Sequence, residues 1–382
     1  MNDDIRPDRA RRRTRRTRSR WVAMGAAGAA GAALFGGVGW AEPAAAPADS
    51  TAGPFADPEV VRADEAHEYL FGTSFGGVDG CGRPAADQWL VPYTRAPVGT
   101  SADSTFGGSC ALGDALVPPT AGWWAEAAAG VWAPTVVEFN GRWHMYFAGK
   151  VAGTGNPGHR CIGHAVADEV AAAYVPDKEP WACPANGRWT LDPDAKVIDG
   201  RLVVAYRDDS VTTGSQTGIS IVATDDEGAA VWRTRRTALT STGVGEWAWN
   251  GPGTAKVIEN PTLVERPAGG GWDLFYSGGE WNSADYGTGI AFCGTDVLAT
   301  TACKTVGSPS SPYFGYSKGR FGAQHLLPGD HPGPGGMDVY AGASGLRAAW
   351  HWWAGGGVRY VRTSALSFTA AAGGGYQVGD LP

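Results

Sequence analysis

The stretch DPEVVRADEAHEYLFGTS, residues 57–74, contains the unit that decides the fold. An x-Pro start is followed by a few apolar residues, a polar turn and a strand rich in aromatic or branched side chains. Four further copies follow: APTVVEFNGRWHMYFAGK (133–150), DPDAKVIDGRLVVAYRDD (192–209), NPTLVERPAGGGWDLFYSGG (260–279) and GPGGMDVYAGASGLRAAWHWW (333–353). Short alternating segments separated by Gly, Asn, Asp and Pro are typical of strands and turns.

The spacing of the five copies indicates how the strands are organised. Successive copies start 76, 59, 68 and 73 residues apart. A period near seventy residues is too long for a solenoid and fits a radial array of four-stranded sheets. A two-sheet sandwich would have evenly spaced strands without this long-period repetition. We therefore predict an all-β fold, a five-bladed β-propeller with four antiparallel strands per blade.

The composition excludes several classes of protein. Of the 382 residues, 18% are charged and 43% are hydrophobic, which rules out an acidic disordered chain and a coiled coil. The chain contains 17 Trp, 12 Tyr and 12 Phe. So many aromatic side chains must fill a large core or face a ligand.

The N-terminal region differs from the rest. Residues 1–20 contain nine Arg and three Asp, residues 21–40 are uncharged and weakly apolar, and Ala44, Ala46 and Ala48 follow. This order predicts a secretory signal peptide and cleavage region over 1–48, and the Arg15–Arg16 pair indicates the twin-arginine route. A transmembrane anchor is the alternative, which the many Gly and Ala residues disfavour.

We predict that residues 49–382 form the catalytic propeller, secreted as a monomer without stable membrane association. Without residues 1–48 the chain has 22 basic and 34 acidic residues, a net charge of −12. Such a chain repels phosphate backbones, so we expect no nucleic-acid partner.

All six cysteines follow residue 48. Six cysteines allow fifteen pairings. We favour the sequence neighbours, which each close a short loop: 81–110, 161–183 and 293–303. His159 and His164 lie near Cys161, and there we expect a disulfide beside two surface histidines rather than a metal site.

Carboxylates stand at several of the x-Pro starts. A propeller blade begins with its innermost strand, so the residues at these starts point at one another across a central funnel. Asp57 and Asp192 begin two copies, and Glu259 directly precedes a third. Three carboxylates converging on one axis are electrostatically costly, so they indicate a bound cation or a function.

The ordered motifs resemble family 43 of the glycoside hydrolases. The matching segments are FADPEVV…EYLFGTS, VWAPTVVEFNGRWHMYF, LDPDAKVIDGRLVVAY, IENPTLVE…WDLFYSGG, DYGTGIAF and GPGGMDVY…AAWHWW. They extend over about residues 55–368. A single Asp-Pro is a common turn, so the specificity comes from the order and spacing of the whole set.

The resemblance implies a five-bladed propeller that hydrolyses glycosidic bonds with inversion. Asp57 would be the general base, Glu259 the general acid, and Asp192 the residue that orients the acid and tunes its pKa. Inversion requires the acid and base to lie roughly 6.5–9.5 Å apart, with room for a water molecule. Asp194 is the alternative to Asp192, and Glu246 and Glu265 are the alternatives to Glu259.

Four further residues are candidates for substrate binding: Trp132, Trp124, Tyr286 and His351. Core packing is the alternative for the aromatic residues. Gly336 stands where the family has a histidine, which counts against a central calcium ion. We therefore predict no metal ligands and no required cofactor.

The resemblance implies a carbohydrate substrate containing arabinose or xylose, such as arabinan, arabinoxylan or xylan. The alternatives are a D-arabinan or galactan, a propeller that binds carbohydrate without catalysis, and a scaffold for protein partners. The scaffold would require a large exposed apolar patch.

Overall fold

The computed structural model describes residues 50–51, 55–74, 89–98, 106, 111–118, 122–124, 130–152, 159–249, 255–299, 301–353, 358–370 and 375–379. The predicted signal peptide, Cys81 and Cys110 lie outside these residues. Within the described ranges, no helix has the length and apolar character needed to cross a membrane.

The described strands form five sheets, which we call blades 1 to 5. Blade 1 contains β2 (Glu59–Arg62), β3 (His67–Phe71), β4 (Pro92–Pro97) and β5 (Gly113–Asp114). Blade 2 contains β6 (Val131–Phe139), β7 (Arg142–Lys150), β8 (Arg160–Ala167) and β9 (Val175–Pro176). Blade 3 contains β10 (Thr190–Ile198), β11 (Arg201–Asp208), β12 (Gly218–Ala223) and β13 (Arg236–Thr240).

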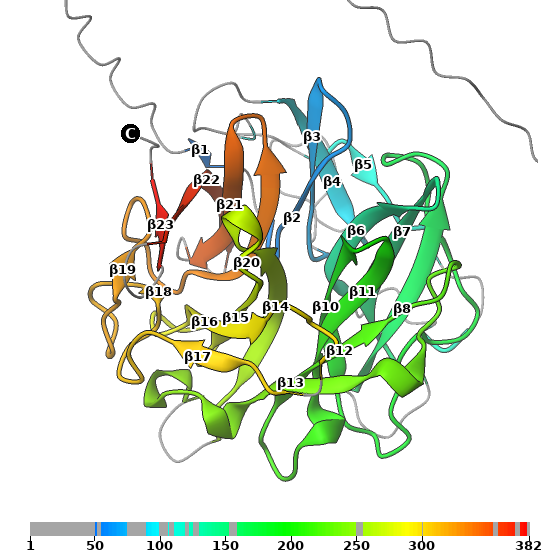
Figure 1. Cartoon of the computed structure of the whole chain (residues 1–382). Helices are drawn as coiled ribbons and strands as arrows, with labels where there is room; N and C mark the ends of the chain where they lie inside the picture. The colour runs from blue at the N-terminus through cyan, green and yellow to red at the C-terminus, as the bar shows by residue number, and fades with distance from the viewer. Residues whose placement is uncertain are drawn as a thin grey trace, which may run out of the picture. The chain divides into compact units, whose positions relative to one another are not determined.

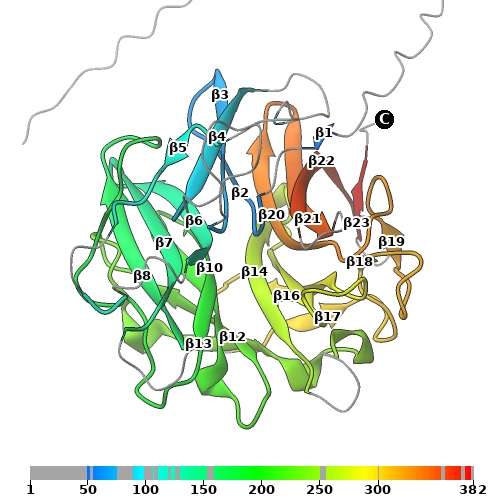
Figure 2. The same cartoon turned by 180° about the vertical axis from the view of Figure 1, so that it is seen from behind.

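The last two blades have additional outer strands. Blade 4 contains β14 (Ile258–Glu265), β15 (Trp272–Gly278) and β16 (Gly287–Gly294), followed by β17 (Lys304–Val306), β18 (Phe314–Gly315) and β19 (His325–Leu326). Blade 5 contains β20 (Gly335–Gly342), β21 (Gly345–Trp353) and β22 (Arg359–Thr369). Among the strands that the structure describes, the pairings are antiparallel except that of β18 with β19. The predicted five-bladed propeller is confirmed, with the innermost strands β2, β6, β10, β14 and β20 around its centre (Figures 1 and 2).

Blade 5 closes the ring because strands from both the N-terminal and the C-terminal end of the propeller pair with β22. β1 (Ser50–Thr51) pairs with β22 through Ser50 opposite Thr363, and β23 (Gly375–Val378) pairs with the later part of the same strand. Both terminal strands lie beside β22 in Figure 1. Pairing with the N-terminal segment reduces the exposed edge of this blade.

Tight turns in the sequence produce the inner hairpins. Asn140–Gly141 connects β6 to β7 and Asp199–Gly200 connects β10 to β11. All four residues have positive φ, between 50° and 76°. Asn-Gly and Asp-Gly suit this conformation, whose twist matches that of the two strands.

Aromatic side chains fill the space between neighbouring blades. Phe71 of blade 1 packs in one cluster with Phe147 of blade 2, and Phe275 of blade 4 packs in another with Trp350 of blade 5. All four are 1% exposed or less. Part of the large aromatic content therefore forms the core.

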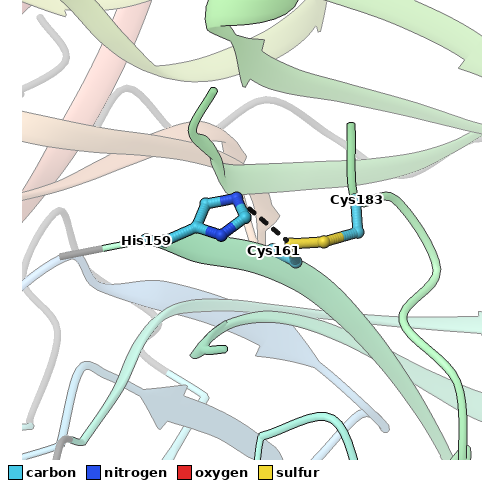
Figure 3. A group of neighbouring side chains, drawn as sticks. All are labelled: His159, Cys161 and Cys183. Atoms are coloured by element: carbon cyan, nitrogen blue, oxygen red, sulfur yellow. Dashed lines mark hydrogen bonds between the residues drawn. A yellow bond between two sulfur atoms is a disulfide. The ribbon is translucent and has the colours of Figure 1, made fainter. Parts of the chain in front are cut away.

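Two of the three predicted disulfides are confirmed, Cys161–Cys183 and Cys293–Cys303. Figure 3 shows the His159 ring beside the first of them. The predicted surface position of His159 and His164 was wrong, since they are 6% and 4% exposed. His164 is buried because its ring stacks on His144.

Candidate active site

Five equivalent residues near the start of the innermost strands have a left-handed backbone. Their φ angles lie between 42° and 56°. The hydrogen-bond register shifts directly after this position in the blades that begin with β6, β10, β14 and β20. The residues are Asp57, Ala133, Asp192, Asn260 and Gly336.

This irregularity turns the chain at the mouth of the propeller. A left-handed conformation is uncommon for residues with a side chain, and a following proline favours extended backbone instead. Strain of this kind occurs preferentially at functional sites. At Gly336 a Cβ atom would lie only 2.7 Å from His351 Nδ1, so a larger residue would displace the imidazole.

The three predicted catalytic carboxylates lie in one cavity of about 190 Å³, which we call the inner cavity. They come from blade 1, blade 3 and blade 4, so residues more than 60 positions apart meet here. Its described lining residues are Asp57, Trp132, Trp189, Leu191, Asp192, Arg207, Glu259, Asn260, Trp281, Tyr286 and Arg359.

Asp57 is held by donors on both carboxylate oxygens. Thr73 Oγ1 donates to Oδ2 at 2.6 Å, and Arg359 Nη1 donates to Oδ1 at 3.1 Å. Burial raises the pKa of Asp57, but Arg359 and the Thr73 hydrogen bond outweigh it, so the pKa is below its usual value. Asp57 therefore stays ionised at neutral pH.

Thr73 and Ser74, the Thr-Ser pair that ends the first repeat, connect blade 1 to blade 2. The Thr73 hydroxyl accepts from Ala133 N–H at 2.9 Å, and the Ser74 hydroxyl accepts from Val131 N–H at 3.0 Å. Thr73 thus fixes Asp57 relative to the neighbouring blade.

His351 lies behind Asp57 and does not belong to the described lining of the inner cavity. Its Nδ1 accepts the Asp57 backbone N–H at 3.0 Å, and its ring stacks on Tyr286. Burial and nearby Arg359 lower the pKa of His351 to about 3, so the ring is neutral. The predicted direct substrate contact of His351 is therefore corrected to positioning of Asp57.

Asp192 is 6% exposed and accepts the Asn260 backbone N–H through Oδ2 at 3.2 Å. Burial and the charges of Glu259 and Asp57 raise its pKa well above the usual value. A proton on Asp192 relieves the repulsion among the three carboxylates.

Glu259 accepts hydrogen bonds from two side chains. Arg207 Nη1 donates to Oε2 at 2.7 Å, and the Tyr286 hydroxyl donates to Oε1 at 2.8 Å. Arg207 also donates to both oxygens of Asp209, so its charge is shared between two carboxylates. Tyr286 accepts in turn from Asn260 Nδ2 at 3.0 Å, and this same amide lies 3.5 Å from Asp57 Oδ1.

The predicted aromatic residues separate into two groups. Trp132 lines the inner cavity, and the Arg160 guanidinium lies 3.3 Å from its ring centroid. Tyr286 lines the cavity as well. The prediction for Trp124 was wrong, because this side chain is 2% exposed and packs edge-on against Phe147 in the core.

The alternative carboxylates lie elsewhere. Glu246 forms a surface ion pair with Lys256, and Glu265 is exposed at the far end of β14. Asp194 follows the bulge on β10 and points to a second group of carboxylates further along the axis, which we call the hub.

The hub contains Glu59, Asp194 and Asp338, with oxygen atoms within 4.8 Å of one another. Lys196 Nζ lies 3.3 Å from both Asp194 Oδ1 and Asp338 Oδ1. Burial lowers the pKa of Lys196, but these aspartates outweigh it and the pKa is raised well above its usual value. The Lys196 ammonium group supplies the positive charge that a metal ion would otherwise bring to these acids. The three acids therefore do not fit a resident metal ion.

The histidine expected as a calcium ligand is replaced by Gly336. His351 does not substitute for it, because Nδ1 accepts a backbone N–H and the neutral ring then carries its proton on Nε2. The described residues of this region therefore do not fit a central calcium ion.

Six residues that line the inner cavity were not among the predicted site residues: Trp189, Leu191, Arg207, Asn260, Trp281 and Arg359. Arg207 lies on β11 and Arg359 on β22, so neither stands at an x-Pro start. Of these two arginines, only Arg207 could have been noticed in the sequence, because it precedes two aspartates at the end of the second strand of the third repeat.

The sequence profile of the glycosyl hydrolases family 43 matches residues 51–313. This match covers more than two thirds of the chain. The chain belongs to this family. It is therefore an inverting glycoside hydrolase with a carbohydrate substrate. No curated protein matches its sequence.

Solved structures agree with the family fold. A thermostable family 43 glycoside hydrolase has a TM-score of 0.64 at 18% identity, over 87% of this chain and 96% of that one. An α-L-arabinofuranosidase from Lactobacillus brevis has a TM-score of 0.61 at 14% identity, over 85% and 94%. An endo-1,4-β-xylanase from Bacteroides thetaiotaomicron has a TM-score of 0.59 at 16% identity, over 87% and 97%.

Proposed function

We propose that this family 43 enzyme is secreted and hydrolyses bonds in arabinose- or xylose-containing glycans. Residues 1–48 support export, because a basic segment is followed by an apolar segment and then by small residues, as in a signal peptide. The similar structures of an arabinofuranosidase and a xylanase support pentose-containing substrates.

The observation that carries the catalytic assignment is the placement of Asp57 and Glu259 in one cavity with different partners. Asp57 comes from blade 1 and contacts Arg359 and Thr73. Glu259 comes from blade 4 and contacts Arg207 and Tyr286. An ionised aspartate on one blade and a second carboxyl group on another are the two groups that inverting hydrolysis uses.

In this proposal Asp57 is the general base and Glu259 the general acid. Asp57 takes a proton from water as the water oxygen bonds to the anomeric carbon. The bond from that carbon to the leaving oxygen breaks, and the leaving oxygen takes the proton of Glu259. Asp57 then releases its proton to solvent, and Glu259 is protonated again.

Asp192 tunes the acid in this proposal. Its raised pKa means that it carries a proton at pH values where an exposed aspartate is ionised. A neutral Asp192 adds no further negative charge beside the ionised Asp57. No metal ion takes part.

A panel of aryl pentosides, arabinans, arabinoxylan, xylan and galactan tests the proposal. We expect release of arabinose or xylose by the wild type, and loss of release in Asp57→Asn and Glu259→Gln. Wild-type turnover by either variant would refute the catalytic assignment. Release of galactose alone would refute the substrate assignment.

Binding without hydrolysis would favour a non-catalytic propeller. Calorimetric titration of the same glycans into the wild type separates this outcome from an inactive preparation. Proton NMR of the first sugar released checks the anomer, and we expect the inverted one.

A further inference from the structure

A separate cavity lies at blade 4, and we call it the blade 4 pocket. Its volume is about 170 Å³, close to the 190 Å³ of the inner cavity. Its described lining residues are Gly245, Trp247, Tyr276, Gly289, Thr305, Val306, Gly307, Ser308, Pro309, Ser311, Tyr313 and Gln324. None of them belongs to the described lining of the inner cavity, so this pocket is not part of the catalytic site.

Two aromatic rings form one wall of the pocket. Trp247 and Tyr276 are 3% and 2% exposed, and their rings stack with centroids 5.9 Å apart. Both face Gly289, where a Cβ atom would lie 2.6 Å from the Tyr276 hydroxyl oxygen and 2.7 Å from Trp247 Cζ2. The absence of a side chain at position 289 therefore leaves space for both rings beside the pocket.

The polar atoms of these two rings are not engaged by the protein. The part of the chain that the structure describes offers no hydrogen-bond partner to the Tyr276 hydroxyl or to Trp247 Nε1. Burial raises the pKa of Tyr276, and no hydrogen bond opposes this effect. The Tyr313 hydroxyl, by contrast, donates to the Tyr376 carbonyl. Because buried polar groups are normally paired, two unpaired groups in one pocket indicate a ligand.

The opposite rim of the pocket is held in place by hydrogen bonds. Gln324 Oε1 accepts the Ser308 N–H at 2.8 Å, and Gln324 Nε2 donates to the Ser311 carbonyl at 3.0 Å. The Glu246 N–H donates to the Pro309 carbonyl at 3.2 Å, which joins this rim to the turn that carries Trp247. The pocket is therefore formed before any ligand binds, which reduces the entropy lost on binding.

The chemistry of the lining restricts the ligand. The described lining contains no Asp, Glu, Lys, Arg or His side chain. A charged ligand would lose its hydration here without gaining an ion pair, so a neutral ligand is favoured. Aromatic faces beside a hydroxyl and an indole N–H suit a molecule with both apolar faces and hydroxyl groups. A single sugar ring has these properties.

We propose that the blade 4 pocket is a non-catalytic site for one neutral monosaccharide of pentose size. The ring packs against Trp247 and Tyr276, and the sugar hydroxyls pair with the Tyr276 hydroxyl and Trp247 Nε1. The choice of a pentose rests on the proposed function, whereas the binding itself requires no catalysis.

Titration of L-arabinose and of D-xylose, each alone, tests the proposal. The wild type is labelled with 5-fluorotryptophan and followed by fluorine NMR, and each resonance is assigned by its absence from a Trp→Phe variant. We expect one of the two sugars to shift the Trp247 resonance to saturation. Trp132 and Trp281 line the inner cavity, so their resonances report binding there separately.

Tyr276→Phe distinguishes a binding role from a structural one. We expect at least fivefold weaker binding of the sugar at Trp247, because one hydrogen bond to the ligand is lost. Without sugar the melting temperature should equal or exceed that of the wild type, because an unpaired buried hydroxyl has been removed. Tyr174→Phe is the control, since the Tyr174 hydroxyl donates to the Val170 carbonyl in blade 2. It should lower the melting temperature and keep the sugar affinity.

Thr305→Trp tests the pocket from its exposed edge. Thr305 is exposed and lines the pocket, and its exposed neighbour Lys304 is not among the described lining residues. An indole at position 305 should fill the pocket and abolish the sugar-dependent shift of the Trp247 resonance. Lys304→Trp is the matched control and should keep that shift.

The outcomes separate this inference from the proposed function. If neither sugar shifts the Trp247 resonance in a wild type that hydrolyses the glycan panel, the pocket proposal is overturned and the proposed function stands. Unchanged sugar affinity in Tyr276→Phe or Thr305→Trp also overturns the pocket proposal. A saturable Trp247 shift in a wild type that hydrolyses no glycan supports the pocket and overturns the proposed function.

Discussion

Carboxylates gather in two regions at the innermost strands of this propeller, the mouth and the hub, and their charge is compensated differently in each. The mouth contains Asp57, Asp192 and Glu259, which line a cavity. The hub, two residues further along β10, contains Asp194 with Glu59 and Asp338 around Lys196. The hub encloses its compensating cation among the acids, and the mouth leaves space for a substrate.

Hydrogen bonds between blades explain why the hub acids are structural. Each accepts a backbone N–H from the next blade: Val60 donates to Asp338 at 2.9 Å, Val136 to Glu59 at 3.2 Å and Leu263 to Asp194 at 2.9 Å. In the mouth, Asp57 and Glu259 are held mainly by side-chain donors. The hub acids line only a small cavity of about 30 Å³, whereas the mouth acids also line the inner cavity of about 190 Å³. A carboxylate near the axis is thus no sign of catalysis unless it faces a cavity large enough for a sugar ring.

The largest expected difference between the mouth and the hub is in the effect of an Asp→Asn substitution on kcat. Asp57→Asn should lower kcat by about 10³-fold, since general base catalysis typically contributes that much. Asp194→Asn should keep wild-type kcat per folded molecule and lower the melting temperature instead, because it weakens the pair with Lys196. Steady-state kinetics and thermal unfolding of both variants check this. Equal kcat losses would mean that the mouth and the hub do not differ in role.

Removal of the hub cation should affect stability. Lys196→Met leaves three buried carboxylates uncompensated, and we expect a loss of about 3 kcal/mol in the free energy of unfolding at pH 8. Burial raises the pKa of Asp194 to about 6 in the folded wild type, above its unfolded value. Protonation of this group is therefore favoured in the folded state, so the loss should be smaller at pH 5. Urea unfolding at both pH values measures it, and a loss that grows at pH 5 would contradict the explanation.

The pH dependence of activity tests whether Arg359 controls the ionisation of Asp57. The guanidinium helps to hold the pKa of Asp57 below its usual value against the opposing effect of burial. Arg359→Met should raise that pKa, so Asp57 takes up a proton at higher pH and the acidic limb of the kcat/KM profile moves upward. The profile from pH 3 to 8 measures the shift. An unmoved acidic limb would show that Arg359 does not control the ionisation of the base.

The smallest effect is expected at Tyr286. Tyr286→Phe removes the hydrogen bond to Glu259 and keeps the ring stacked on His351. One such bond is worth about 1 kcal/mol, which corresponds to a fall in kcat of about fivefold. Tyr313→Phe is the control, since Tyr313 bonds to Tyr376 in the core of blades 4 and 5. A larger loss in the control would exclude a specific role for the Tyr286 hydroxyl.

Several parts of the site were predictable because they repeat. Asp57 and Asp192 stand at equivalent x-Pro starts, and Glu259 precedes a third, so five-fold symmetry alone predicts that they converge. Arg359 contacts Asp57 from 302 residues away, and no repeat position identifies it. Trp124 was misassigned because a loop tryptophan that packs on Phe147 has the same local sequence signal as one that faces a ligand.

The sequence by itself determined the blades and the positions at which acids meet the axis. These follow from turn residues and strand periodicity, which act over a few neighbours and recur five times. Only the tertiary structure decided which acids face a cavity, which share Lys196, and which cations and tryptophans complete the site. Those properties depend on contacts between blades, where burial and charge arise from residues far apart in the chain.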